Sequence, residues 1–269
     1  MSAILFLEQS LNGVQFGLML FLLAAGLTLV FGIMDMINLA HGSLYMLGAF
    51  LASTFVQLTG SFLAGVLLAI PATAVLGMVL EISILRTLYA RDHLSQVLAT
   101  FALILIINEL VRLVWGSDAA LPMPAALSGP VELLPGLRYP SYRLVIIGVG
   151  LAVALLLYFL VTRTRVGMLV RAGASNREMA LAMGVDIKTL FTLVFGVGAA
   201  LCALAGAMLA PLLAVQVGMG ENILILAFVV IVIGGVGSVR GALVGAVLVG
   251  VVDTIGRAFL PIVLGAFFQ

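Results

Sequence analysis

Residues 10–33 read SLNGVQFGLMLFLLAAGLTLVFGI, an apolar run without a charged side chain. A helix needs about 20 such residues to cross the hydrocarbon core of a membrane, so this run predicts a transmembrane helix. Outward from it, runs of the same kind predict seven further spans. They cover 38–57, 61–85, 94–115, 142–162, 188–214, 222–238 and 241–263.

The composition agrees with a membrane protein. Of the 269 residues 64% are hydrophobic and only 9% are charged, against roughly 25% charged residues in soluble domains. A soluble or disordered chain is excluded, because neither could keep so much apolar surface from water. The net charge of +1, without a basic block, argues against a nucleic-acid partner. We therefore expect an all-α polytopic membrane protein in the lipid bilayer, with about eight transmembrane helices in a single domain over 1–269.

Basic residues predict how the spans are oriented. The first of them is Arg86, so the N-terminal run lacks the basic start of a cleavable signal peptide. Eight of the 12 basic residues fall in loops on one side of the predicted spans: Arg86, Arg91, Arg163, Arg165, Arg171, Arg177, Lys188 and Arg240. Because basic loops stay in the cytoplasm, we expect the segment 163–187 to be cytoplasmic. The loop 116–141 and both termini would then face outward.

Two segments interrupt the apolar pattern, each just before a glycine-marked helix start. Paired interruptions indicate a transport pathway, since unwound backbone is tolerated inside a membrane only where it lines protein or water. The candidate pathway residues are Asn38, His41, Gly42, Gly234, Gly235, Gly237 and Gly241. The alternative is that both segments are ordinary tight loops between neighbouring spans.

Side chains with catalytic or metal-binding chemistry are sparse. His41 has no second histidine at metal-ligand spacing, so a hydrogen-bonded structural role is the favoured interpretation. Glu109 and Arg112 have the spacing of a local ion pair on a helix, and so have Asp253 and Arg257. The sequence contains no phosphate-binding loop and no protease motif. We therefore expect no catalytic residue, no metal site and no cofactor bound by this chain.

The segment 175–184 is predicted to form a short cytoplasmic helix. Ser175 and Glu178 have the spacing of a capping box, and Gly184 is typical of a residue that ends a helix. Asp186 would cap the following span. One face of the helix would carry Asn176, Met179, Ala180 and Met183. Because so short a helix is marginal alone, we expect this face to dock on another protein, the alternative being contact with lipid headgroups.

Three motifs occur together, in this order, in one protein family. They are Met36-Ile37-Asn38-Leu39-Ala40-His41-Gly42, then Arg171 to Asn176 with Ala180 and Gly184-Val185, and then Gly234-Gly235-Val236-Gly237-Ser238 with Gly241. The chain resembles the Liv-type permeases of bacterial ABC importers for branched-chain amino acids, over nearly its whole length. Members of that family usually continue for one further hydrophobic span beyond the position of Phe268-Gln269, which would return the C-terminus to the cytoplasm.

This resemblance implies an inner-membrane permease subunit for branched-chain amino acids or a related small polar or organic solute. Its partners would be a second related permease, two cytoplasmic ATP-binding subunits that use the ATP, and a periplasmic solute-binding protein. The segment 175–184 would be the coupling helix that sits in a groove of an ATPase. Asn38, His41 and Gly42 would belong to a broken helix near the central pathway, and Gly42 and Gly241 would lie near the partner permease. The alternative function is a stand-alone channel or secondary transporter, which would need no docking helix.

Overall fold

The protein is an assembly of helices, which the computed structural model describes over residues 3–259. The helices are α1 (Ala3–Met34), α2 (His41–Thr59), α3 (Phe62–Leu80), α4 (Arg86–Leu88), α5 (His93–Trp115), α6 (Ser141–Arg163), α7 (Arg165–Ser175), α8 (Arg177–Ala182), α9 (Ile187–Leu209), α10 (Met219–Gly234) and α11 (Val239–Phe259). A π-helical turn, Glu81–Leu85, joins α3 to α4, and a 3-10 turn, Ala125–Leu127, follows α5.

The strands are short and lie in the connecting loops. β1 (Asp118–Ala119) pairs antiparallel with β4 (Val215–Gln216), and β2 (Pro130–Leu134) pairs antiparallel with β3 (Leu137–Pro140). The loop 116–141 therefore contains a small hairpin, β2–β3. The first strand of this loop, β1, pairs with β4 in the segment between α9 and α10.

The all-α membrane fold is confirmed. Within the described residues, 7 helical segments are long and apolar enough to cross a membrane, and α10, the remaining predicted span, has only 16 residues. The predicted span 188–214 was too long, because α9 ends at Leu209, next to Pro211, whose nitrogen has no proton to donate. Residues 260–263 of the last predicted span lie outside the described residues.

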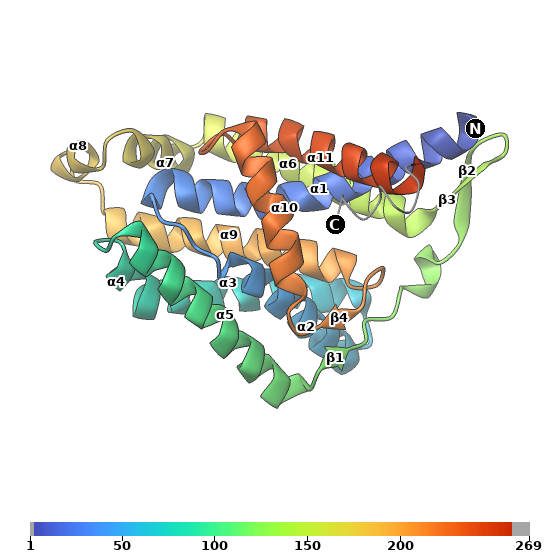
Figure 1. Ribbon diagram of the computed structural model, residues 1–269, viewed down its shortest axis with the longest axis horizontal. Helices are drawn as coiled ribbons and strands as arrows, with labels where there is room; N and C mark the ends of the chain where they lie inside the picture. Colours follow the sequence, from blue (N-terminus) through green and yellow to red (C-terminus); the bar gives the residue numbers. More distant parts are fainter. Residues whose placement is uncertain (1–2, 260–269) are drawn as a thin grey trace.

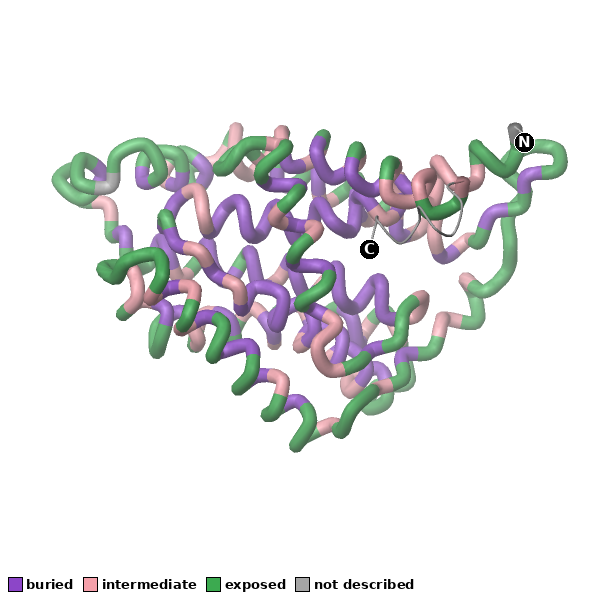
Figure 2. Tube along the Cα trace, in the orientation of Figure 1, coloured by how far each residue is buried: buried purple, intermediate pink, exposed green. Residues whose placement is uncertain are grey.

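The helices divide into an inner and an outer set. Most residues of α1, α2 and α9 are buried, whereas a third or fewer are buried in the apolar parts of α3, α5, α6 and α11, as Figure 2 shows. Small residues let the inner helices approach closely. A Cβ built on Gly206 of α9 would lie 2.1 Å from the carbonyl oxygen of Tyr45 in α2. The exposed large side chains of the outer helices are mostly apolar, as expected of surfaces that face lipid or a partner helix.

The basic loops gather at one end of the molecule. In Figure 1, α4, α7, α8 and the junction between α10 and α11 lie at the same end, and the β2–β3 hairpin lies at the other. We call the end with α7 and α8 the basic end, because it carries the basic residues of segments 86–91 and 163–188 together with Arg240. The arrangement is the one expected if the basic end faces the cytoplasm.

Candidate functional site

The first helix break connects α1 to α2 through residues 35–40. Asn38 is fully buried there, and its Oδ1 accepts a hydrogen bond from the backbone N–H of Ala40 at 3.0 Å. Asp35 turns the chain out of α1 with a φ of 51°, a conformation that few residues other than glycine adopt. The break is thus a buried turn closed by one side chain, and α2 starts directly after it at His41.

His41 lies where α1, α2 and α9 meet. Its side chain is fully buried, and Nε2 is 3.0 Å from Sγ of Cys202, within hydrogen-bond distance. The ring meets Phe195 edge to face, with 6.5 Å between the centroids. A Cβ on Gly26 of α1 would lie 2.9 Å from Nε2, so a glycine is needed for the helix to pass the imidazole. This packing agrees with the structural role that the sequence favours for His41.

The second break connects α10 to α11 and is built from glycines. Gly235 and Gly237 have φ values of 87° and 80°, which disfavour residues with a Cβ. Ser238 Oγ accepts the backbone N–H of Gly241 at 3.0 Å. A Cβ on Gly241 would lie 1.7 Å from the carbonyl oxygen of Gly234, so the two helices fold back on each other with their backbones in contact.

Gly42 packs on Gly220 of the same chain. The resemblance placed it near the partner permease, but it is buried within this chain, where a Cβ would lie 2.4 Å from the carbonyl oxygen of Gly220. The missing side chain lets α2 and α10 cross in backbone contact. The glycine therefore serves packing inside the subunit, and its position relative to a partner permease stays a prediction.

The two breaks meet at the basic end. A Cβ on Gly32, in the last turns of α1, would lie 2.8 Å from Cα of Gly237. Beside this contact is a cavity of about 690 Å³, whose lining includes Asp35 from the first break, Val236 from the second, and Arg171 from α7. The cavity brings together segments that are 60 to 200 residues apart in the sequence. Asn38 and His41 do not line it, since both face the buried interior.

The short helix predicted at 175–184 starts one residue later than expected. Asn176, not Ser175, is the N-cap of α8, and its Oδ1 accepts the N–H of Met179 at 2.9 Å. Ser175 is the last residue of α7, a helix that the sequence analysis missed. Because α7 occupies the chain up to Ser175, the capping turn moves to the next polar residue.

The helix-ending turn predicted at Gly184 is confirmed. Gly184 has a φ of 83°, and its N–H donates to the carbonyl of Leu181, while the N–H of Val185 donates to that of Ala180. This pair of bonds is the Schellman motif. Asp186 then caps α9, and the hydrogen bonds from the Thr189 side chain and backbone hold the pKa of Asp186 below its usual value.

The prediction of the docking face of α8 is wrong for Ala180. Ala180 is only 5% exposed and belongs to the hydrophobic core of the subunit, because α8 packs this side on α9. Met179, Leu181 and Met183 are instead 59%, 53% and 78% exposed. Asn176 and Glu178 are exposed as well. The exposed surface of α8 and its C-cap therefore includes Met179, Leu181 and Met183 but not Ala180.

Comparison with known proteins gives the family. Residues 10–269 match the family described as branched-chain amino acid transport system / permease component. The chain belongs to this family. The predicted Liv-type resemblance is thereby confirmed, and the chain is a non-catalytic, multi-pass permease of the inner membrane.

Its relatives align over most of their length. The high-affinity branched-chain amino acid transport system permease protein BraD of Pseudomonas aeruginosa is 31% identical over 264 residues, covering 93% of this chain and 86% of BraD. The corresponding LivH protein of Escherichia coli is 29% identical over 275 residues, covering 95% of this chain and 87% of LivH. A probable LivH protein of Methanocaldococcus jannaschii is 27% identical over 259 residues, covering 93% and 81%. No solved structure matches this permease.

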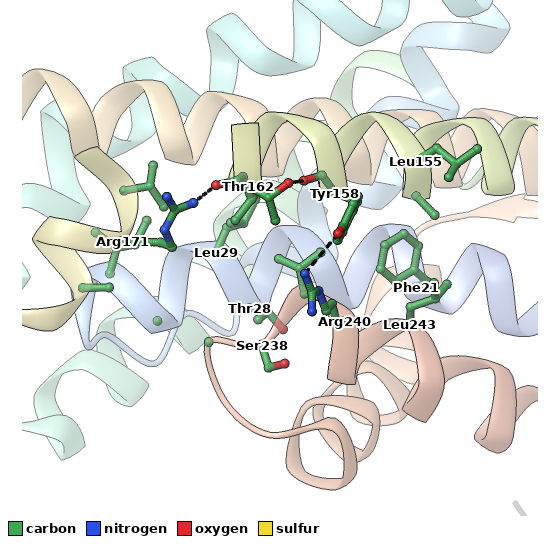
Figure 3. A pocket seen from close by; sticks show the side chains of 18 of the residues that line it. Phe21, Thr28, Leu29, Leu155, Tyr158, Thr162, Arg171, Ser238, Arg240 and Leu243 are labelled. Atoms are coloured by element: carbon green, nitrogen blue, oxygen red, sulfur yellow. Dashed lines mark hydrogen bonds between the residues drawn. The ribbon is translucent and has the colours of Figure 1, made fainter. Parts of the chain in front are cut away.

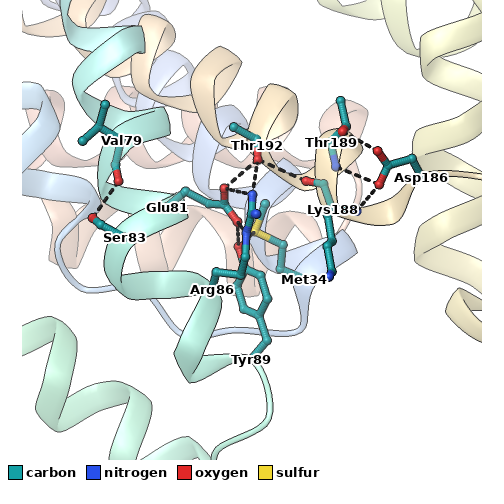
Figure 4. A network of polar contacts seen from close by, with 10 residues as sticks. All are labelled: Met34, Val79, Glu81, Ser83, Arg86, Tyr89, Asp186, Lys188, Thr189 and Thr192. Atoms are coloured by element: carbon teal, nitrogen blue, oxygen red, sulfur yellow. Dashed lines mark hydrogen bonds and ion pairs between the residues drawn. The ribbon is translucent and has the colours of Figure 1, made fainter.

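The sequence analysis missed one polar network at the basic end of the permease (Figure 4). Glu81 is fully buried in the π-helical turn, with Oε2 3.0 Å from Nη2 of Arg86. Thr192 of α9 donates to the same oxygen at 2.6 Å, and Tyr89 donates to Oε1 at 2.8 Å. A buried carboxylate needs such partners, and here they tie α3 to α9. Glu81 is the one charged residue in 61–85, a signal that could have pointed to it.

The two local ion pairs are confirmed. Arg112 lies 3.0 Å from Glu109, and Arg257 lies 2.9 Å from Asp253. Both pairs are formed within a single helix, on α5 and α11. Their spacing of three and four residues brings the side chains together without help from the rest of the fold.

Proposed function

We propose that this permease is the transmembrane subunit of an ABC importer that moves branched-chain amino acids or a related small solute. A second related permease would complete the pathway, two cytoplasmic ATP-binding subunits would supply the energy, and a periplasmic solute-binding protein would deliver the solute. The relatives' names support the substrate class, because they describe branched-chain amino acid transport.

The exposed surface of α8 carries this proposal. Met179 and Leu181 project from α8, a helix of 6 residues at the basic end, and Met183 projects from its C-cap. Burying a side chain of this size against a partner is favourable by about 1.5–3 kcal/mol, so three together favour a docked state. Both ends of α8 are closed by hydrogen bonds within the chain. The surface is thus presented in a defined shape before any partner arrives.

A mechanical route from this surface to the breaks supports the same function. α8 follows α7 directly, and α7 contributes Arg171 and Ser175 to the cavity that also contacts Asp35 and Gly237. Movement of a partner docked on α8 would therefore reach both breaks through α7. In this proposal Asn38, His41 and Gly42 hold the first break in place from the buried side.

The test places charges on the exposed surface of α8. Met179→Glu together with Met183→Glu should reduce ATPase copurification more than tenfold and abolish substrate-stimulated hydrolysis in reconstituted membranes. The reason is that a carboxylate buried without a partner costs several kcal/mol, and each 1.4 kcal/mol is a factor of ten. Ala180→Glu is unsuitable, because Ala180 lies in the core of the subunit.

Met168→Glu is the matched control. Met168 is 55% exposed, at the same end, but on α7. The Met168→Glu variant should still copurify with the ATPases and keep the hydrolysis rate of the wild type. If the double variant on α8 also keeps both, α8 is not the docking surface. If the wild-type chain brings no ATPase at all and still conducts solute, the stand-alone channel or secondary transporter is correct.

A further inference from the structure

A second cavity lies between α1, α6, α7 and the start of α11, close to the basic end (Figure 3). Its volume is about 480 Å³, within the range of sites that hold small organic ligands. It is separate from the exposed surface of α8. One part of its lining is apolar, and the rest carries arginine and hydroxyl side chains.

One end of this cavity is apolar. Phe21, Leu155 and Leu243 lie together there, on α1, α6 and α11 respectively (Figure 3). Leu155 is 69% exposed, and Leu151, one turn before it, is 49% exposed. The cavity therefore adjoins the outer face of α6, which the bilayer covers. An alkyl chain of a lipid could enter from that side without crossing water.

The rest of the lining is positively charged, with Arg171 far from the apolar end and Arg240 between the two (Figure 3). Arg240 lies over the ring of Tyr158, 4.8 Å from its centroid, and Nη2 donates to the Tyr158 hydroxyl at 3.2 Å. Arg171 donates to the backbone carbonyl of Val161. Neither guanidinium forms an ion pair within the part of the chain that the structure describes. No carboxylate lines the cavity either. The charge thus favours an anion, and the lining offers no acidic partner to an ammonium group.

Thr28 provides an independent sign of a ligand. It lines the same cavity, its side chain is fully buried, and its hydroxyl has no hydrogen-bond partner among the described residues. A threonine in a helix usually donates to the carbonyl one turn earlier, as Thr73 does to Ala69 at 2.9 Å. A buried hydroxyl without a partner is unfavourable. Figure 3 shows Thr28 near Ser238 and Arg240, where an oxygen-rich group would meet all three.

We propose that this cavity binds an anionic phospholipid of the leaflet at the basic end. The phosphate lies between Arg171 and Arg240 and accepts hydrogen bonds from them and from Thr28, while the start of one acyl chain lies along Phe21, Leu155 and Leu243. Basic pockets between transmembrane helices on the cytoplasmic side favour anionic headgroups. A zwitterionic amino acid fits less well, because its ammonium group would have no acidic partner.

The test is lipid binding to the purified full-length chain, measured by native mass spectrometry. Phosphatidylglycerol should bind at least tenfold more tightly than phosphatidylcholine. Arg171→Gln together with Arg240→Gln should weaken phosphatidylglycerol binding about thirtyfold, since each basic residue near an anionic lipid contributes roughly a fivefold factor. Thr28→Val should weaken it severalfold without changing the elution of the protein from size exclusion.

Arg163→Gln together with Arg165→Gln is the matched control, because both residues are exposed at the same end but do not line the cavity. This variant should bind phosphatidylglycerol as the wild type does. Equal losses in the two double variants would mean binding by general surface charge and would overturn the proposal. Displacement of the lipid by equimolar inorganic phosphate would show a simple anion site. Displacement by leucine would make the cavity part of the solute pathway instead.

Discussion

The first break is held by buried side chains, whereas the second is held by glycine backbone. Asn38 closes the turn between α1 and α2 from a fully buried position, next to His41. Gly235 and Gly237 make the turn between α10 and α11 with positive φ angles in an exposed position. The same sequence pattern, an interruption before a glycine-marked helix start, is thus stabilised in two different ways. A buried side chain holds the first break, and glycines with positive φ angles form the second.

The difference shows where each break is vulnerable. In the first, the surroundings are buried, so removing the Asn38 acceptor would leave the N–H of Ala40 unpaired. In the second, water can replace a lost partner, and the constraint is the backbone conformation itself. We therefore expect the first break to be sensitive to side-chain removal and the second to be sensitive to the addition of a Cβ.

The largest effect should come from Gly42→Leu. Its side chain would enter the backbone of Gly220, so α2 and α10 could not cross, and neither backbone can move far inside a packed core. We expect a loss of more than about 3 kcal/mol in the free energy of unfolding and little folded protein. The measurement is an unfolding titration in sodium dodecyl sulfate. Gly148→Leu on α6 is the control, since a Cβ there meets nothing within 4 Å. Equal stability of the two variants would remove the packing argument for Gly42.

Asn38→Ala should have the next largest effect. It leaves the buried N–H of Ala40 without its acceptor, which costs about 1–2 kcal/mol. The matched change at the second break is Ser238→Ala, which removes the acceptor for the N–H of Gly241. Because Ser238 is exposed, water can replace it and the loss should be smaller. The same unfolding titration compares the two. A larger loss for Ser238→Ala would contradict the distinction between a buried and a solvated break.

Gly237→Ala should have the smallest effect of the three. The added methyl group meets no close atom, with Cα of Gly32 at 3.7 Å, so the cost is that of the positive φ alone. An alanine in this left-handed conformation costs about 1 kcal/mol. Gly129→Ala, in the loop and without a positive φ, should leave the unfolding midpoint unchanged. An unchanged midpoint for Gly237→Ala as well would mean that the second break relaxes freely.

Features that depend on neighbouring residues were predictable. The pairs Glu109–Arg112 and Asp253–Arg257, the end of α8 at Gly184 and the cap at Asp186 all use hydrogen bonds or charges within a few residues. The apolar runs also locate most of the long helices. The start of α8 was missed by one residue, since the length of α7 decides whether Ser175 or Asn176 makes the turn.

By itself, the sequence determined that this chain crosses a membrane, which loops are basic and where the helices break, because hydropathy, charge and capping act over one or two helical turns. Only the tertiary structure decided which side of α8 is free, that Gly42 packs on Gly220, and that Glu81 is buried against Thr192. It also placed Arg171 and Arg240 on one cavity. Each of these depends on which helix packs against which. That choice is made by contacts between different helices, and the spacing of residues within one helix carries no information about it.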